Sequence, residues 1–221
     1  TYNAGSLMNS MVESLEPDEN GELKDAAIKL LQAADFNISD YHFSVKQGAP
    51  SDIALPPGIS LEKDMLENIR AFELKMYHEV ETVNGIESVP LPFHMESDGT
   101  QLYFAYCPAI VKALKTGRTI VIDEIDNGLH PILVRHLVEI FNSRETNPNG
   151  AQLIFNTHDI DLLDLDFLRR DQIYFVEKDH RTGVSDLYAL SDFSPRKSEK
   201  IQKGYMLGRY GAIPNIGGVE W

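Results

Sequence analysis

Cysteine is nearly absent from this sequence, where Cys107 is the only one among 221 residues. A single cysteine excludes a disulfide framework within the chain and a four-cysteine zinc site, and it fits a reducing compartment. Long apolar runs are absent too. None approaches the roughly 18 residues of a membrane-spanning helix, and the first residues lack the pattern of a signal peptide. We therefore expect a cytoplasmic protein that does not contact membranes.

Positive charge is also scarce, with 20 Lys and Arg residues against 34 Asp and Glu residues and a formal net charge of -14. This charge repels phosphate backbones, so nucleic acid would need a local patch or another part of the molecule, and its binding stays open. The seven histidines show no His-Glu-x-x-His spacing, which argues against a metal other than magnesium. A Gly-x-Ser-x-Gly elbow for acyl transfer is missing as well.

The hydrophobic content of 43% is enough for one compact α/β domain. Apolar residues at three- and four-residue spacing predict an amphipathic helix over 23–34. The Gly- and Pro-rich composition of 44–59 predicts a loop. Two runs rich in aromatic and β-branched residues, 74–82 and 88–94, flank Asn84-Gly85 and predict a hairpin on a sheet edge.

The second half of the chain alternates between strands and helices. One helix is predicted to begin just after residues 97–100, to kink at Pro108 and to end at Gly117. A second helix is predicted over 131–141 and a final strand over 186–190, ahead of a polar, glycine-rich tail. Three short apolar runs are predicted to be strands of one sheet, namely 119–122, 153–155 and 173–176. The alternation is typical of a parallel sheet that is covered on both faces.

Two adjacent carboxylates, Asp123 and Glu124, follow the strand predicted over 119–122. They would lie at the C-terminal edge of a parallel strand, where open α/β sheets bind ligands. In phosphoryl transfer a first acid holds Mg²⁺, usually through water, and a second orients or deprotonates the attacking water. The pair fits these roles in order. The alternative is an acidic strand end that only caps a turn.

Three further polar motifs belong to the same pattern. His158 follows the strand predicted over 153–155, where an imidazole could contact a γ-phosphate or its attacking water. Residues 126–130 make a tight turn into the helix that starts at Pro131. Residues 97–100, Ser-Asp-Gly-Thr, open another helix, whose free amides and dipole favour an anion. Each has a plain alternative: a structural histidine, a solvated helix start and simple capping.

Four motifs in this order resemble the AAA/ABC-type ATPases of bacterial anti-phage and abortive-infection systems, the RloA-like group. These ATPases are related to SMC-type and OLD-type ATPase heads. The motifs are Glu96–Thr100, Ile120–Pro131, Gln152–Asp159 and the tail Gly204–Pro214. The resemblance covers roughly 93–214. It implies an ABC-ATPase-like, P-loop NTPase fold of the α/β class, with a mostly parallel sheet flanked by helices and an edge β-hairpin.

The resemblance implies a role for each motif, with ATP and Mg²⁺ as cofactors. Asp123 would be the Walker B magnesium ligand, Glu124 the catalytic carboxylate and His158 the switch histidine. Asp126 would open the D-loop, which runs to His130. The signature motif, which touches the γ-phosphate bound by an opposite protomer, would comprise Ser97, Gly99 and Thr100. This trans contact implies a homodimer or higher homo-oligomer, although Ser-Asp-Gly-Thr departs from the commoner Leu-Ser-Gly-Gly form.

The phosphate-binding loop of an intact ATPase, Gly-x-x-x-x-Gly-Lys-Ser/Thr, does not occur in the 221 residues. We therefore expect the chain to be a C-terminal half, whose partner is an N-terminal Walker A half that precedes Thr1. Within it, 1–92 would be a helical and loop region leading into the edge hairpin. The lobe with the signature helix, Walker B, D-loop, switch histidine and tail would be 93–221.

Three functions are compatible with these residues. The first is ATP binding and hydrolysis that controls a partner effector, a nuclease or toxin, in anti-phage defence. The second is an ATPase-like scaffold without catalysis that only mediates association. The third is a metal-dependent nuclease that uses Asp123, Glu124 and His158. The order of the strands favours the first over the third.

Overall fold

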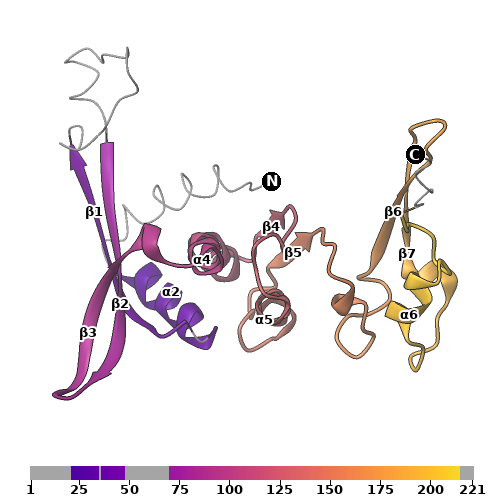
Figure 1. The fold of residues 1–221 in the computed structure, drawn as a ribbon. Coiled ribbons are helices and arrows are strands. Elements are labelled where there is room, and N and C mark those ends of the chain that lie inside the picture. Colours follow the sequence, from indigo (N-terminus) through magenta and orange to yellow (C-terminus); the bar gives the residue numbers. More distant parts are fainter. Residues whose placement is uncertain (1–20, 35, 48–69, 215–221) are drawn as a thin grey trace, which may run out of the picture. The chain divides into compact units, whose positions relative to one another are not determined.

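The computed structural model describes residues 21–34, 36–47 and 70–214 (Figure 1). The chain divides into two compact units, Thr1–Thr157 and His158–Trp221. This division concerns compactness and does not test the boundary expected after residue 92, which stays a prediction. The α/β class predicted from the sequence is confirmed by strands and helices in the first unit.

The first unit contains a three-stranded antiparallel sheet in the order β1-β2-β3. Its strands are β1 (Ile38–Gln47), β2 (Arg70–Thr82) and β3 (Gly85–Pro92). Strands β2 and β3 form the hairpin predicted around Asn84-Gly85, and Thr82 pairs with Gly85 next to the turn. The hairpin is therefore confirmed.

One expectation about this sheet is wrong. Residues 44–47 belong to β1 and not to a loop, because they pair with β2 from Glu73 to Arg70, and this tertiary pairing overrides a polar local composition. The rest of the expected loop, 48–59, lies outside the described residues. Within the described chain, the hairpin lies in the same sheet as β1, and β3 forms an edge of that sheet, as expected.

Two helices pack beside this sheet, α2 (Glu22–Ala33) and α4 (Asp98–Thr116). Both were predicted. Helix α4 is continuous through Pro108, and Gly117 ends it in the left-handed conformation with φ of 67°, where glycine is favoured. Helix α2 contacts α4 and β1. No helix in the part of the chain described by the structure is long and apolar enough to cross a membrane.

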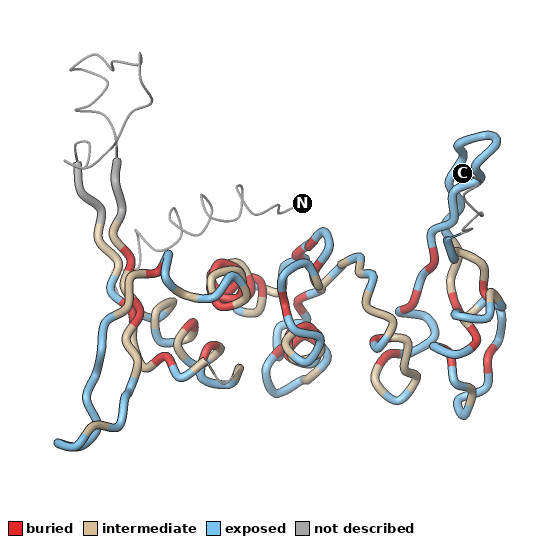
Figure 2. Tube along the Cα trace, viewed as in Figure 1, coloured by how far each residue is buried: buried red, intermediate tan, exposed pale blue. Residues whose placement is uncertain are grey.

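Helix α4 supplies much of the core of the first unit, as the buried residues in Figure 2 show. Phe104 is fully buried and makes edge-type contacts with Tyr41 on β1 and with Phe93. Tyr103, also fully buried, packs on Phe36 and reaches the main-chain oxygen of Leu30. Each such aromatic ring contributes roughly 1.5–3 kcal/mol of hydrophobic stabilisation. These contacts fix α4, and with it residues 97–100, against the sheet.

Strands β4 (Thr119–Ile122) and β5 (Gln152–Phe155) form a two-stranded parallel sheet, joined through α5 (Pro131–Asn142). The predicted parallel pairing and crossover helix are confirmed. The prediction that both faces are covered is wrong for the described residues, because burial alternates along the strands. Ile122 is 1% exposed, whereas the neighbouring Val121 is 41% exposed and Ile154 on β5 is 55% exposed.

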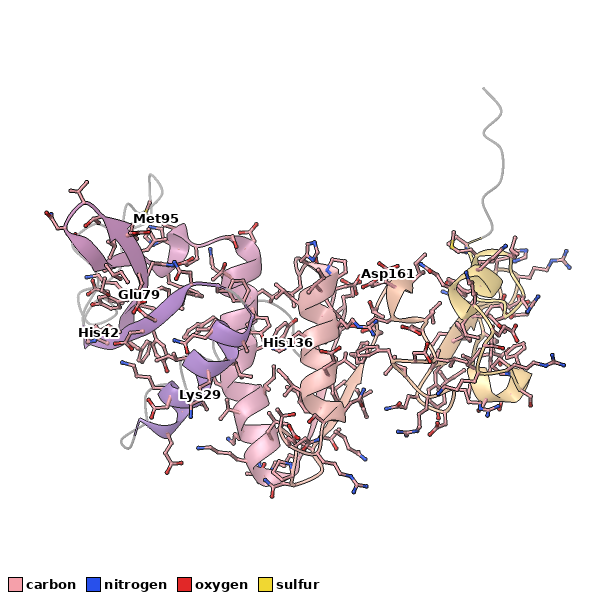
Figure 3. All side chains as sticks on the ribbon, turned by 90° about the horizontal axis from the view of Figure 1, so that it is seen from below. Lys29, His42, Glu79, Met95, His136 and Asp161 are labelled. Carbon is pink, nitrogen blue, oxygen red and sulfur yellow. The ribbon has the colours of Figure 1, made fainter. Side chains whose placement is uncertain are left out.

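Figure 3 shows His136 on the side of α5 that faces α4.

The second unit contains an antiparallel pair, β6 (Tyr174–Lys178) and β7 (Ser185–Ala189). The third apolar run, 173–176, was expected in the parallel sheet, and this is wrong. Its strand pairs with β7, because the turn after Lys178 is closed by Asp179, whose carboxylate accepts hydrogen bonds from the Arg181 and Thr182 amides. The final strand expected over 186–190 is confirmed as β7.

The described part of the glycine-rich tail, which ends at Pro214, includes α6 (Ile201–Met206), which the sequence analysis did not predict. Phe175 on β6 stacks on Tyr205 and Tyr210, with ring centroids 5.5 and 5.8 Å apart. The Tyr210 hydroxyl donates to Glu199 at 2.8 Å, and its ring is 1% exposed. The tail is thus packed against the sheet of its own unit.

Candidate active site

The acid pair lies where β4 ends, in the first unit. Ile122 and Ile125 are buried on either side of it, at 1% and 0% exposure, while Asp123 and Glu124 are exposed. The two buried side chains anchor the backbone, and the carboxylates between them remain open to solvent. Asp123 and Glu124 therefore occupy the C-terminal end of a parallel strand, as the sequence predicted, which is the usual ligand-binding edge of such sheets.

Asn156, directly after β5, holds the backbone of this acid pair. Its side-chain oxygen accepts the Glu124 amide hydrogen at 2.7 Å, and its main-chain oxygen accepts the Ile125 amide hydrogen at 3.2 Å. Glu124 has φ of 50°, a left-handed conformation that non-glycine residues seldom adopt. The sequence analysis gave Asn156 no role. The register of β4 and β5 could have revealed this role. Ile122 pairs with Phe155, so the residues that follow these two must be neighbours.

The segment 126–130 makes the tight turn that the sequence predicted. The Asn127 amide donates to the Glu124 carbonyl at 2.9 Å, and the Leu129 amide donates to the Asp126 carbonyl at 3.3 Å. Leu129 is buried at 6% exposure. His130 then caps α5, because its Nδ1 accepts the Ile132 amide hydrogen at 3.3 Å. His130 serves the helix start here, while Asn127 reaches the Glu124 carboxylate at 3.5 Å.

The beginning of α4 lies against this turn. A Cβ atom on Gly99 would come 3.1 Å from the carbonyl oxygen of Gly128, so only glycine leaves this contact unstrained. The Ser97 side chain accepts the Thr100 amide hydrogen at 3.1 Å and hydrogen bonds the Thr100 hydroxyl at 2.7 Å. The structure thus brings two predicted motifs together, residues 97–100 and 126–130. Ser97 therefore caps the start of α4.

A second pair of side chains supports the start of α4 from the antiparallel sheet. His78 Nε2 on β2 and Glu96 Oε1 lie 2.7 Å apart, and their side chains are 21% and 7% exposed. The Gln101 side chain donates to the Glu96 main-chain oxygen at 2.8 Å. Sequence analysis missed this pair, because the partners are 18 residues apart on different elements.

His158, the predicted switch histidine, is the first residue of the second unit. It is exposed, and the following Asp159 caps a short 3-10 helix (Ile160–Leu162) by accepting the Asp161 amide hydrogen at 2.9 Å. Asp123 and Glu124 belong to the first unit and His158 to the second, so the role of His158 as the switch histidine stays a prediction.

The acids at the end of β4 bear on whether this site could hold magnesium. Within the described residues, no group of three or more His, Cys, Asp or Glu side chains could hold a metal ion by itself. Mg²⁺ in phosphate sites needs only one or two carboxylates, with water and substrate phosphates as the other ligands. An exposed Asp123 at the ligand-binding edge fits that requirement.

These elements define a mixed α/β domain with two acids at the end of a parallel strand. Residues 12–166 match the family described as "AAA domain, putative AbiEii toxin, Type IV TA system". This match covers most of the chain, so the chain belongs to that family, and its resemblance to AAA/ABC-type ATPases of the abortive-infection kind is confirmed.

Several solved structures are similar to this chain, and one of them is described here, whereas the search of curated proteins gave no match. That structure comes from work described as "Structural biochemistry of ATP-driven dimerization and DNA stimulated activation of SMC ATPases". The likeness covers 86% of this chain and 97% of that chain, with 13% sequence identity and a TM-score of 0.39.

Proposed function

We propose that this chain is the C-terminal half of an ATPase head that binds and hydrolyses Mg-ATP together with an N-terminal Walker A half. The observation that carries the proposal is the position of Asp123 and Glu124 at the C-terminal end of β4, in a chain of the AAA family. The 221 residues contain no phosphate-binding loop. We therefore assign the phosphate cradle to a segment outside this sequence.

The proposed chemistry divides between the two acids. Asp123 would hold Mg²⁺, which when bound supplies positive charge to the phosphate oxygens. Glu124 would orient the attacking water and take its proton, a role that needs a carboxylate within hydrogen-bond reach of that water. His158 would contact the γ-phosphate or the same water. The side-chain amide of Asn127 donates to the Glu124 carboxylate at 3.5 Å and supports the orientation of this carboxylate.

The proposal includes a second protomer. Ser97, Gly99 and Thr100 would contact the nucleotide bound by the opposite head, with Asp126 at the interface. Support comes from the packing of the α4 start on the turn after β4, which joins the two motifs in one surface region. Dimer opening and closing would then control a partner effector, a nuclease or toxin, in anti-phage defence.

The first experiment measures Mg-ATP binding and hydrolysis by this chain with and without the polypeptide encoded immediately upstream. We expect turnover only when both are present. Glu124→Gln should lower turnover at least roughly 100-fold, to a small residual rate, and retain ATP binding, because it removes the proton acceptor and keeps the shape of the side chain. The matched control is Glu145→Gln, which changes an exposed glutamate on a loop after α5 and should leave turnover unchanged.

Three results would contradict the ATPase proposal. Normal turnover in Glu124→Gln would remove the catalytic role of this residue. No turnover under any condition would favour the scaffold, which the absence of the phosphate-binding loop from these residues also supports. Metal-dependent DNA cleavage without ATP would favour the nuclease.

A further inference from the structure

The backbone of Glu124 is held in a conformation that its own chemistry disfavours. Its φ of 50° lies in the left-handed region, which is unfavourable for a non-glycine residue. Asn or Gly would adopt this conformation more readily than Glu. The conformation must therefore be maintained by contacts with neighbouring residues.

Three hydrogen bonds maintain it, and Asn156 makes two of them. The Asn156 side-chain oxygen accepts from the Glu124 amide at 2.7 Å, and its main-chain oxygen accepts from the Ile125 amide at 3.2 Å. The Asn127 amide donates to the Glu124 carbonyl at 2.9 Å. The peptide groups on both sides of Glu124 are thus fixed. Of the three bonds, only the one accepted by the Asn156 side chain can be removed by truncating a side chain.

The chemistry of asparagine suits this task. Its amide oxygen accepts a main-chain hydrogen bond without adding charge, and serine would be too short to keep the same distance. Aspartate would place a third negative charge beside Asp123 and Glu124, which like-charge repulsion disfavours.

We propose that Asn156 is a positioning residue for Glu124: it fixes the left-handed backbone that presents the carboxylate to the attacking water. This inference rests on the proposed function, because it names a residue that acts through the proposed catalytic carboxylate. Asn127 complements it by contacting the carboxylate itself at 3.5 Å.

The test is a double-mutant cycle in the protein supplied with its upstream half. Asn156→Ala should lower kcat roughly 10- to 100-fold and leave KM within about twofold, because a misplaced catalytic group costs turnover and not ground-state binding. In a Glu124→Gln background, the same substitution should cause no further loss. Asn84→Ala, in the exposed hairpin turn, is the control and should leave kcat unchanged.

A second readout does not depend on activity. Amide hydrogen exchange at Glu124 should be slow in the wild type and accelerate in Asn156→Ala, while the melting temperature changes little. Unchanged exchange and unchanged kcat would overturn the inference. A fall in kcat that is additive with Glu124→Gln would also overturn it, because a general structural role is additive. Normal turnover in Glu124→Gln alone would instead reject the proposed function, and the exchange measurement would still decide whether Asn156 holds this backbone.

Discussion

Tyr210 and Glu199 form a hydrogen-bonded pair that is sensitive to pH. The Tyr210 hydroxyl lowers the pKa of the Glu199 carboxyl below its ordinary range, with a further contribution from Arg209. A depressed carboxyl pKa stabilises the fold above the unfolded-state pKa, and this contribution is lost as the pH falls through the folded-state pKa. The second unit should therefore weaken in acid, at pH values below the ordinary carboxyl pKa.

Substitution of Tyr210 by Phe tests this linkage, because it keeps the stacked ring and removes the hydroxyl. Compared with the wild type, Tyr210→Phe should be less stable at pH 7, and the difference should shrink as the pH falls through the depressed folded-state pKa of Glu199. Urea unfolding at several pH values, followed by near-UV circular dichroism, measures the free energy of unfolding of the two proteins and its dependence on pH. A difference in stability that does not change with pH would contradict the assignment.

At the scale of elements, the His78–Glu96 pair joins β2 to the start of α4. His78→Ala would leave a carboxylate that is 7% exposed without its partner, and an unsatisfied buried group costs about 1–3 kcal/mol. We expect the free energy of unfolding to fall by that amount. His94→Ala, which changes an exposed histidine in the same region, should stay within about 0.5 kcal/mol. Chemical denaturation of the two variants makes the comparison, and equal losses would contradict a supporting role for the pair.

The elements with strong local signals were predictable from the sequence. The strand 119–122 has the predicted bounds. A glycine precedes its apolar run and two acidic residues follow it, so both ends of the strand are marked in the sequence. Helix α5 begins at Pro131, whose fixed φ favours the first helical position. Asp123, Glu124 and the turn 126–130 follow from these two elements, so their place at one sheet edge could also be predicted.

The remaining features depend on contacts that are distant in sequence. Residues 44–47 become a strand only by pairing with β2, and 173–176 join β7 and not the parallel sheet. Asn156 acquires its role from the register of β4 and β5. The position of His158 relative to the acids depends on how the two units combine, which no local pattern specifies.

At the scale of the whole molecule, the exposed face of β4 and β5 bears on the proposed partner. Val121 and Ile154 are 41% and 55% exposed, although parallel strands are usually covered on both faces. The proposed Walker A half would cover this face. Val121→Lys should then weaken association with the upstream polypeptide at least roughly tenfold, since a buried lysine without a partner is costly.

The matched control is Ile132→Lys, at the exposed first turn of α5, where Ile132 is 69% exposed. It should leave association unchanged, and both variants should keep the melting temperature of the isolated chain. Isothermal titration calorimetry measures the two affinities. If Val121→Lys associates like the wild type, this face is not where the partner binds.

The packing of the tail has a consequence for how related sequences vary. A Cβ atom on Gly204 would lie 2.8 Å from the Tyr210 ring, and one on Gly211 would lie 2.6 Å from the Tyr188 hydroxyl oxygen. The tyrosine rings therefore set the space available at both glycines. Across related chains, residue 204 should change together with residue 210, because a smaller side chain at 210 frees position 204 to accept alanine. Gly211, whose φ is +68°, lacks this freedom even where Tyr188 is replaced.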